Sequence, residues 1–460
     1  MNVIVLSAVW GVIMMFSGLF IADKSKAKYI AVAGLLVLIA GNYFDLHYQF
    51  IISSNLNGLL RFDSFGMIFT TVALISTLLY FLLTGSEIEK VGNHVYEYFA
   101  LIFFVLCGVA IVSVYNNYLM LFLGIEIISI PLYILTGADK RNLKSNEASL
   151  KYFLMGSFST GIMLMGIAFI YGGTGTFHLE LPLVTSSTLP VLISFGIVFL
   201  AIALAFKVSA APFHFWTPDV YDGAPTVFTS FMATVVKVAA FIAFVRLFEV
   251  SFGPMKADWQ DKVILLMIMA TLIIGNVTAV FQQSVKRMLA YSSIAQAGFM
   301  LFAVYAVNAL AKEGILIYAA AYCLATIGIF AVLARLKDYT FDGFNGLAKQ
   351  QPLVAFFTTI FLLSLAGIPL TAGFLAKYYM VAAVMKSGSF IWMILTAMLC
   401  AAVSVYYYFR VIQAMYFKQG DAIAADASRG FKIVLGITAL LIILLGVIPN
   451  SILLDWYHIL

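Results

Sequence analysis

The sequence predicts an all-α polytopic membrane protein with about 14 transmembrane helices, and three observations support this fold class. The chain is 63% hydrophobic and only 10% charged, whereas a typical soluble domain is about 45–50% apolar and about 25% charged. Its apolar runs are each about 20 residues long, which is the length that a membrane-spanning helix needs. Lys and Arg gather in short segments between these runs. A soluble fold of this composition would not stay soluble.

The predicted spans follow one another at short intervals. The first, Val3–Ala22, has no basic region before it and no small-residue cleavage pattern, so we expect a retained helix and not a removed signal peptide. The second span is expected to be short. The spans are predicted to begin near Val3, Tyr29, Phe62, Val95, Tyr118, Ala148, Pro190, Pro225, Gln260, Met288, Lys312, Pro352, Ser389 and Phe431.

Positive charge is distributed unevenly between the two ends of these spans. Alternate loops hold most of the Lys and Arg residues, whereas the opposite loops hold only Arg61, Lys256, Lys262, Lys312 and Lys386. Because cytoplasmic loops retain positive charge, the rich loops are predicted to be cytoplasmic. With an even number of spans, both termini are expected outside. The net charge of +5 is spread over these loops, so the bilayer is the expected partner and nucleic acid is not.

Four ionisable residues fall deep inside predicted spans: Glu126, Lys207, Lys237 and Lys377. A charge at the centre of a membrane helix costs a few kcal/mol, so each indicates a functional site. One glutamate cannot neutralise three lysines, and burial disfavours the charged form of an amine. We therefore expect at least one lysine to exchange protons. A structural ion pair is the alternative for Glu126 and Lys207.

Prolines accompany three of these charges. Pro131 follows Glu126, Pro212 follows Lys207, and Pro369 precedes Lys377. A proline in a helix removes one backbone hydrogen bond, and irregular backbone at membrane depth is tolerated where it is buried in protein or lines a hydrated cavity. The pattern predicts broken helices at the seventh and twelfth spans along a hydrated polar path. A packing kink is the alternative for any single proline.

The two predicted breaks are five spans apart, which indicates an internal repeat. A repeat unit with an odd number of helices enters the membrane from the opposite side the second time, as in many transporters. We expect two inverted five-helix repeats between N-terminal and C-terminal transmembrane helices, with boundaries at residues 1–94, 95–249, 250–418 and 419–460.

Other chemistry-bearing residues give weaker indications. His214, at the end of the seventh span, is a candidate proton relay because imidazole titrates near neutral pH; a packing or capping role is the alternative. Cys107, Cys323 and Cys400 lie in apolar runs without the spacing of a metal site or a disulfide framework. Dinucleotide, P-loop, paired-cysteine and haem motifs are missing from the sequence, so no cofactor, metal or redox centre is expected in this chain.

Five segments resemble the antiporter-like membrane subunits of respiratory complex I, the bacterial NADH-quinone oxidoreductase. The resemblance extends from about Asp63 to Arg410. A lysine, and not a glutamate, at position 377 is similar to the N-type branch of this family. The segments are LFLGIEIISIPLYIL around Glu126, LAFKVSAAPFHFWTPDVYDGAPT around Lys207, ATVVKVAAF around Lys237, SVKRMLAYSSIAQAGFM from Ser284 to Met300, and LAGIPLTAGFLAKYYM around Lys377.

The resemblance implies proton translocation coupled to quinone reduction elsewhere in a complex. Glu126 would pair with Lys207, Lys237 would be the central relay, and Lys377 the outward-side lysine. NAD, FMN, iron–sulfur clusters and quinone would belong to partner subunits, and the direct partners would be neighbouring antiporter-like and small membrane subunits. The chain would be a non-redox translocase subunit in the bacterial cytoplasmic (inner) membrane.

Three alternatives to this function are weighed. Multisubunit cation/proton antiporters share the same core. A stand-alone solute transporter would need a substrate-shaped polar site at the midplane, where Asn, Asp and Arg are nearly absent. A structural scaffold would not need three buried lysines.

Overall fold

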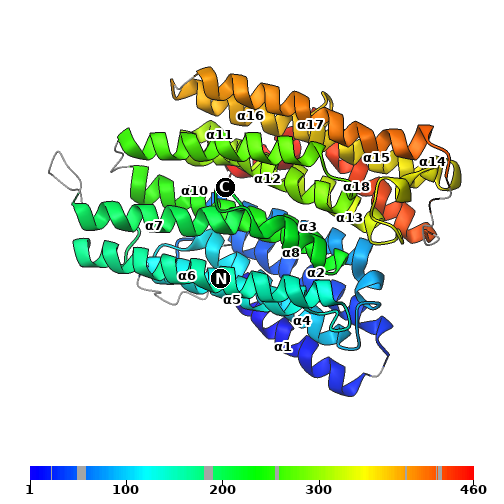
Figure 1. The fold of residues 1–460 in the computed structure, drawn as a ribbon. Helices are drawn as coiled ribbons and strands as arrows, with labels where there is room; N and C mark the ends of the chain where they lie inside the picture. Colours follow the sequence, from blue (N-terminus) through cyan, green and yellow to red (C-terminus); the bar gives the residue numbers. More distant parts are fainter. Residues whose placement is uncertain are drawn as a thin grey trace.

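A computed structural model of the protein describes residues 1–21, 23–48, 58–180, 190–253, 258–388, 391–420, 422 and 427–459. Within these ranges all regular elements are helices, apart from isolated bridges between single residues. Most of the long helices run side by side along one direction (Figure 1). The predicted all-α fold is confirmed.

The first half of the chain forms the helices up to Phe252. These are α1 (Asn2–Phe20), α2 (Ser25–Tyr48), α3 (Ser64–Ile88), α4 (Val95–Val114), α5 (Tyr118–Thr136), α6 (Leu143–Thr174), α7 (Val191–Val208), α8 (Trp216–Gly223), α9 (Thr226–Phe231), the π-helix η1 (Met232–Val236), α10 (Lys237–Leu247) and the π-helix η2 (Phe248–Phe252).

The second half continues in the same manner and ends in short helices. It contains α11 (Asp258–Val280), α12 (Val285–Ala306), α13 (Ala309–Leu333), the 3-10 helix η4 (Asp342–Phe344), α14 (Leu347–Gln350), α15 (Pro352–Ala366), α16 (Ala372–Lys386), α17 (Ile391–Phe417), α18 (Arg429–Val447), the π-helix η5 (Asn450–Leu454) and α19 (Asp455–Ile459).

Thirteen helices in the described ranges are long and apolar enough to span a membrane, and α15 is a shorter apolar helix. The chain is therefore a multi-pass membrane protein, and the count of 14 spans stays a prediction. The expectation of a short second span was wrong, because α2 has 24 residues. Its polar residues are accommodated: Asp45 pairs with the N-terminal amine at 3.1 Å. The predicted start at Ser389 lies outside the described residues.

Two helix pairs are interrupted where broken spans were expected. α7 ends at Val208 and Ser209 adopts a left-handed conformation, whereas α8 begins only at Trp216. α15 ends before Gly367, which is also left-handed, and α16 begins at Ala372. Whether each pair crosses the membrane as one broken span stays a prediction.

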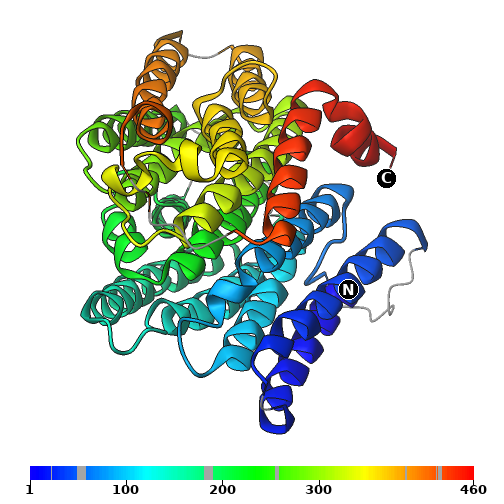
Figure 2. The ribbon, with the colours of Figure 1, turned by 90° about the vertical axis from the view of Figure 1, so that its right-hand side faces the viewer.

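Lys237 lies on one of the most deeply buried helices of the bundle, whereas the apolar window of α7, which carries Lys207, is 50% buried. The apolar windows of α12 and of the α9–α10 segment are 94% buried and that of α13 is completely buried, whereas that of α1 is only 22% buried. Figure 2 shows α1 and α2, in blue, at one flank of the bundle and α17, in orange, at the opposite flank. The central helices can therefore hold polar side chains away from lipid.

Candidate functional site

Lys207 of α7 and Glu126 of α5 each bind a different neutral side chain. Lys207 Nζ donates to Ser129 Oγ at 2.8 Å, and Glu126 Oε1 accepts from Thr160 Oγ1 at 2.7 Å. Ser129 lies three residues after Glu126, on nearly the same face of α5. No direct ion pair within 4.0 Å joins these two described residues. The structure thus holds the lysine and the carboxylate apart through two hydroxyl groups.

The interruption after Lys207 is stabilised by side chains that bond to its backbone. Trp216 Nε1 donates to Phe206 O at 3.0 Å, and Ala211 N donates to Thr271 Oγ1 at 2.8 Å. Thr217 Oγ1 donates to Ser209 Oγ at 2.7 Å. The first two bonds give partners to backbone groups at the break, as burial in a membrane protein requires, and the third joins two side chains across it.

His214 lies in this interruption, between α7 and α8. Its Nδ1 atom is buried and has no hydrogen-bond partner in the described part of the chain. None of its contacts brings it onto Lys207 or Lys237. His214 therefore lies in the interruption that follows Lys207 but makes no described contact with a lysine.

Lys237 is a fully buried lysine that has no acidic partner among the described residues. It is the first residue of α10 and directly follows the π-helix η1, a distortion that often marks functional sites. Lys237 Nζ donates to Ser293 Oγ at 2.5 Å and to Ser293 O at 3.1 Å. Tyr322 also donates to Ser293 Oγ, at 3.0 Å, and Nζ lies 5.8 Å from the centre of the Tyr221 ring. Within the described ranges, all hydrogen bonds of this amine go to neutral oxygens.

Lys377 is held by the carboxyl end of the preceding helix. Its Nζ donates to Leu365 O and to Ala366 O, both at 2.9 Å. These are the last carbonyls of α15, where the helix dipole favours a cation. Gly367 has φ 86°, and a Cβ there would lie 3.0 Å from Lys377 Cδ. A glycine at this position therefore lets the lysine reach back across the interruption.

A cluster of neutral polar side chains lies between Lys237 and Lys377. Gln296 Nε2 donates to Leu365 O at 2.9 Å and to Tyr408 OH at 3.2 Å, and Gln296 also accepts from Tyr318. A small cavity adjoins this cluster and is lined by Tyr322, Gln296 and Leu365; its size suits about one water molecule. By contrast, side-chain hydrogen bonds between described residues do not bridge Lys207 to Lys237.

Lys286 is a buried lysine that the sequence grouped with the loop charges. It is 3% exposed, and its Nζ donates to Asp222 O at 2.9 Å and to Ala224 O at 2.7 Å. These carbonyls end α8. The next residue, Arg287, pairs with Asp219 of α8 at 2.9 Å, and Lys151 of α6 pairs with the same carboxylate at 2.9 Å. Three cations thus fix α8 between α6 and α12.

The end of α8 opens into a polar cavity of about 930 Å³. Lys90, Lys140, Lys144 and Lys286 line it together with acidic residues. Glu89 is one of these acidic residues, and burial raises the pKa of its carboxyl group. The cavity gives water access to the end of the bundle where cytoplasmic loops are predicted.

At the opposite end, Arg246 is 2% exposed and pairs with Asp63, the N-cap of α3. The distance from Arg246 Nη2 to Asp63 Oδ1 is 2.5 Å. The pair tethers α10 to α3. Arg246 is therefore a buried structural cation and not an end-of-helix loop charge.

The neutral partners of the lysines are not apparent from the sequence. Ser129, Thr160, Ser293 and Gln296 were not assigned, although Ser293 and Gln296 lie three residues apart within an otherwise apolar stretch. That spacing places both on one face of α12.

A helical bundle with three central lysines, each bound by neutral oxygens, defines a membrane protein suited to moving cations. Residues 116–445 match the family model described as NADH:quinone oxidoreductase/Mrp antiporter, transmembrane region. The chain therefore belongs to this family. The predicted family is confirmed.

Relatives within the family are similar over nearly the whole chain. NADH-quinone oxidoreductase subunit N of Cytophaga hutchinsonii is 40% identical and that of Flavobacterium psychrophilum 36% identical, each over 98% of this chain and 99% of the relative. Both names agree with the predicted N-type branch.

Solved structures agree with this assignment. A chain of respiratory complex I from Thermus thermophilus with bound aureothin is 30% identical, with a TM-score of 0.85 over 98% of both chains. A chain of the Mrp complex from a Dietzia species has a TM-score of 0.82 over 99% of this chain and 96% of that chain, at 18% identity, and shares the fold.

Proposed function

We propose that this protein translocates protons across the membrane as the antiporter-like subunit N of an NADH-quinone oxidoreductase. The family match and the relatives named subunit N support this function over a multisubunit cation/proton antiporter. One observation in the structure supports the chemistry: Lys237 and Lys377 are buried, and in the part of the chain that the structure describes their amines bind neutral oxygens only.

The partners of Lys237 and Lys377 suit reversible protonation. A carboxylate partner would stabilise the ammonium form and hold its proton, whereas a hydroxyl or carbonyl oxygen accepts a hydrogen bond without adding negative charge. Desolvation then leaves the charged and neutral forms of the amine closer in free energy. In our proposal, protons pass from Lys207 to Lys237 and then to Lys377.

The route between Lys237 and Lys377 would use the polar cluster on α12. Ser293 and Tyr322 lead to the small cavity, and Gln296 leads from it to Leu365 O, which also binds Lys377. One water in that cavity would complete the path. Lys207 has no such link to Lys237, so we infer that additional water or a side-chain movement connects them. His214, which lies near the gap, remains a candidate relay.

Glu126 is proposed to control the first lysine. Rotation of Lys207 from Ser129 toward the Glu126 carboxylate would form an ion pair that retains the proton, and rotation back would release it. The observed arrangement corresponds to the open form of this switch.

Coupling and placement follow from the same proposal. The energy would come from quinone reduction elsewhere in the complex, with NAD, FMN, iron–sulfur clusters and quinone in partner subunits and no redox step in this chain. We place the protein in the bacterial cytoplasmic membrane with both termini outside. We also propose that residues 95–249 and 250–418 are the two inverted repeats, flanked by helices in 1–94 and 419–460.

Isolation of the tagged chain in mild detergent tests the proposed function. We expect flavin-containing and iron–sulfur subunits to co-purify, and proteoliposomes of the isolated complex to move protons during NADH oxidation by quinone. A chain that purifies without them and exchanges Na⁺ for H⁺ on its own would support the antiporter alternative.

A further inference from the structure

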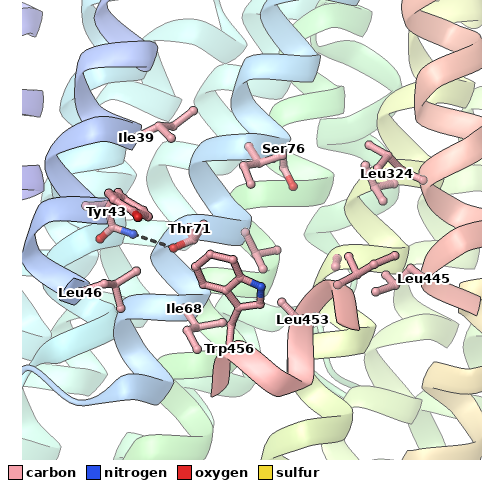
Figure 3. Close-up of a pocket in the computed structure, with 16 residues that line it drawn as sticks. Ile39, Tyr43, Leu46, Ile68, Thr71, Ser76, Leu324, Leu445, Leu453 and Trp456 are labelled. Carbon is pink, nitrogen blue, oxygen red and sulfur yellow. Dashed lines mark hydrogen bonds between the residues drawn. The ribbon is translucent and has the colours of Figure 1, made fainter. Parts of the chain in front are cut away.

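An apolar cleft lies between the N-terminal helices and the C-terminal end of the chain (Figure 3). Residues of α2 and α3 line one side, residues of α18, η5 and α19 the other, and Ala320 and Leu324 of α13 complete it. None of the proposed relay residues lines the cleft. Its volume is about 360 Å³, within the range of roughly 300–1,000 Å³ that is usual for small-molecule sites.

The described lining of the cleft offers no charge to a ligand. None of its described residues is acidic or basic, and its members with polar groups are Asn42, Tyr43, Thr71, Ser76 and Trp456. Asn42 Nδ2 already donates to Thr71 Oγ1 at 2.6 Å and to Met67 O at 3.3 Å, and Thr71 donates to Met67 O at 3.1 Å. An uncharged hydrocarbon complements such walls, because a polar group buried there would lose its hydrogen bonds to water.

The cleft is too small to enclose a helix of a partner protein. One turn of an α-helix, about 10 Å across and 5.4 Å long, fills about 400 Å³, more than the whole cleft. Ile68 and Ser76 both line the cleft on α3, and eight residues of helix span about 12 Å. The space therefore suits a single extended chain.

The cleft is continuous with the membrane-facing surface. Beside it, Leu36 of α2 and Leu440 of α18 are each 54% exposed. Near one end of the cleft, the Tyr43 and His47 rings stack at 4.2 Å, and the His47 ring lies 5.9 Å from that of Trp456. Tyr and Trp favour the boundary between hydrocarbon and headgroups, so this aromatic end marks the boundary side of the cleft.

We propose that the cleft binds one acyl chain of a membrane phospholipid, with the headgroup at the end formed by Tyr43, His47 and Trp456. The bound chain fills the space between α2–α3 and α18–α19. The contact matters because the apolar windows of α2 and α18 are each only 33% buried within the protein. The acyl chain thereby packs against α2 and α18 where side chains of the protein leave them uncovered.

Photo-crosslinking in native membranes tests the site. The probe is a phosphatidylethanolamine with a diazirine in the middle of one acyl chain, added to membranes that contain the assembled complex. After irradiation, we expect mass spectrometry to find adducts on the α13 segment around Leu324 and on the α18 segment around Leu445. Adducts on outward-facing residues of α6 and α17 report general lipid contact.

Variants that fill the cleft separate a specific site from general contact. Ala320→Phe fills it from α13, and Ile75→Trp fills it from a 42% exposed position, where a larger side chain endangers folding less. Both should abolish the cleft adducts and leave those on α6 and α17, whereas the control Ala402→Phe on α17 should leave the cleft adducts unchanged. The proposal is overturned by cleft adducts that persist in both filling variants, by no cleft adducts in the parent, or by labelling only with a diazirine-bearing quinone.

Discussion

Gln296 and Lys377 donate to the same oxygen atom, the carbonyl of Leu365, each at 2.9 Å. Gln296 belongs to α12, which also carries Ser293, the partner of Lys237. Lys377 belongs to α16. The carbonyl belongs to the last turn of α15. A change in the protonation of Lys377 should therefore alter the hydrogen bond that Gln296 donates to the shared carbonyl.

Replacement of Gln296 tests this shared contact. Gln296→Leu keeps the approximate size but removes the donor to Leu365 O and the acceptor for Tyr318. We expect slower proton pumping by the assembled complex, measured in inverted membrane vesicles as acidification per NADH oxidised. Gln419→Leu, at an exposed position, is the matched control.

A double-mutant cycle then tests coupling. Because the two side chains share one acceptor, the effects of Gln296→Leu and Lys377→Ala should be non-additive, with an interaction of about 0.5–3 kcal/mol in the pumping rate. Additive effects would show that the shared carbonyl has no role in transfer.

Replacement of Lys237 tests the central relay. Lys237→Ala should lower pumping to less than about a tenth of the parent rate, because a positioned proton-transfer group contributes roughly 10²–10⁴-fold. Lys237→Arg should also impair pumping, since guanidinium effectively never releases its proton. The same vesicle assay measures both, with membrane insertion checked by immunoblot.

Lys337→Ala removes an exposed lysine and serves as the control. Normal pumping by an assembled Lys237→Ala complex would reject the assignment.

The fold class and the charged members of the site could be predicted from one sequence, because both depend on local patterns. A charge inside an apolar run, as at Lys237, is visible without knowing what packs against it. Its partner Ser293 is 56 residues away, and only the crossing of α10 and α12 brings them together. Serine and glutamine occur in many membrane helices, so Ser293 and Gln296 carried no indication strong enough to assign a role.

The burial of Lys286 could not be predicted for a different reason. It lies two residues from the start of α12, in a segment that looks like a cytoplasmic loop end. Lys286 is buried because the end of α8 packs on it and accepts its hydrogen bonds, a contact that the sequence does not indicate. Likewise, the π-helix before Lys237 has no distinguishing residue in the sequence.

Lys286 provides a prediction about stability as well as pumping. Lys286→Met removes the donor to Asp222 O and Ala224 O, and each buried acceptor left without a partner costs about 1–3 kcal/mol. We expect a lower thermal midpoint of the purified complex and slower pumping, because α8 also presents Tyr221 to Lys237. Lys144→Met, which removes an exposed lysine at the same cavity, is the control. An unchanged midpoint would mean that α8 is held by other contacts.

Glu126 and Lys207 give the last prediction, that their separation sets how firmly the first lysine holds its proton. At an effective dielectric near 20, opposite charges attract by about 4 kcal/mol at 4 Å and by about 2 kcal/mol at 8 Å. The difference corresponds to about 30-fold in proton retention, because about 1.4 kcal/mol is tenfold. Glu126→Gln removes this control and should slow pumping by up to about 30-fold, whereas Glu126→Asp should keep partial activity because the charge remains on a shorter side chain.

Ser129 allows the switch to be tested from its other side. Ser129→Ala removes the hydroxyl that binds Lys207 Nζ in the open form, so the ammonium should move toward the Glu126 carboxylate and hold its proton longer. Pumping should therefore fall in Ser129→Ala as well, whereas Ser129→Ala should cause little further loss in a Glu126→Gln background because the competing carboxylate is gone. Glu147→Gln, on the exposed face of α6, controls for removal of a nearby carboxylate. Pumping equal to the parent in an assembled Glu126→Gln complex would leave the two residues as a structural tether and reject the switch.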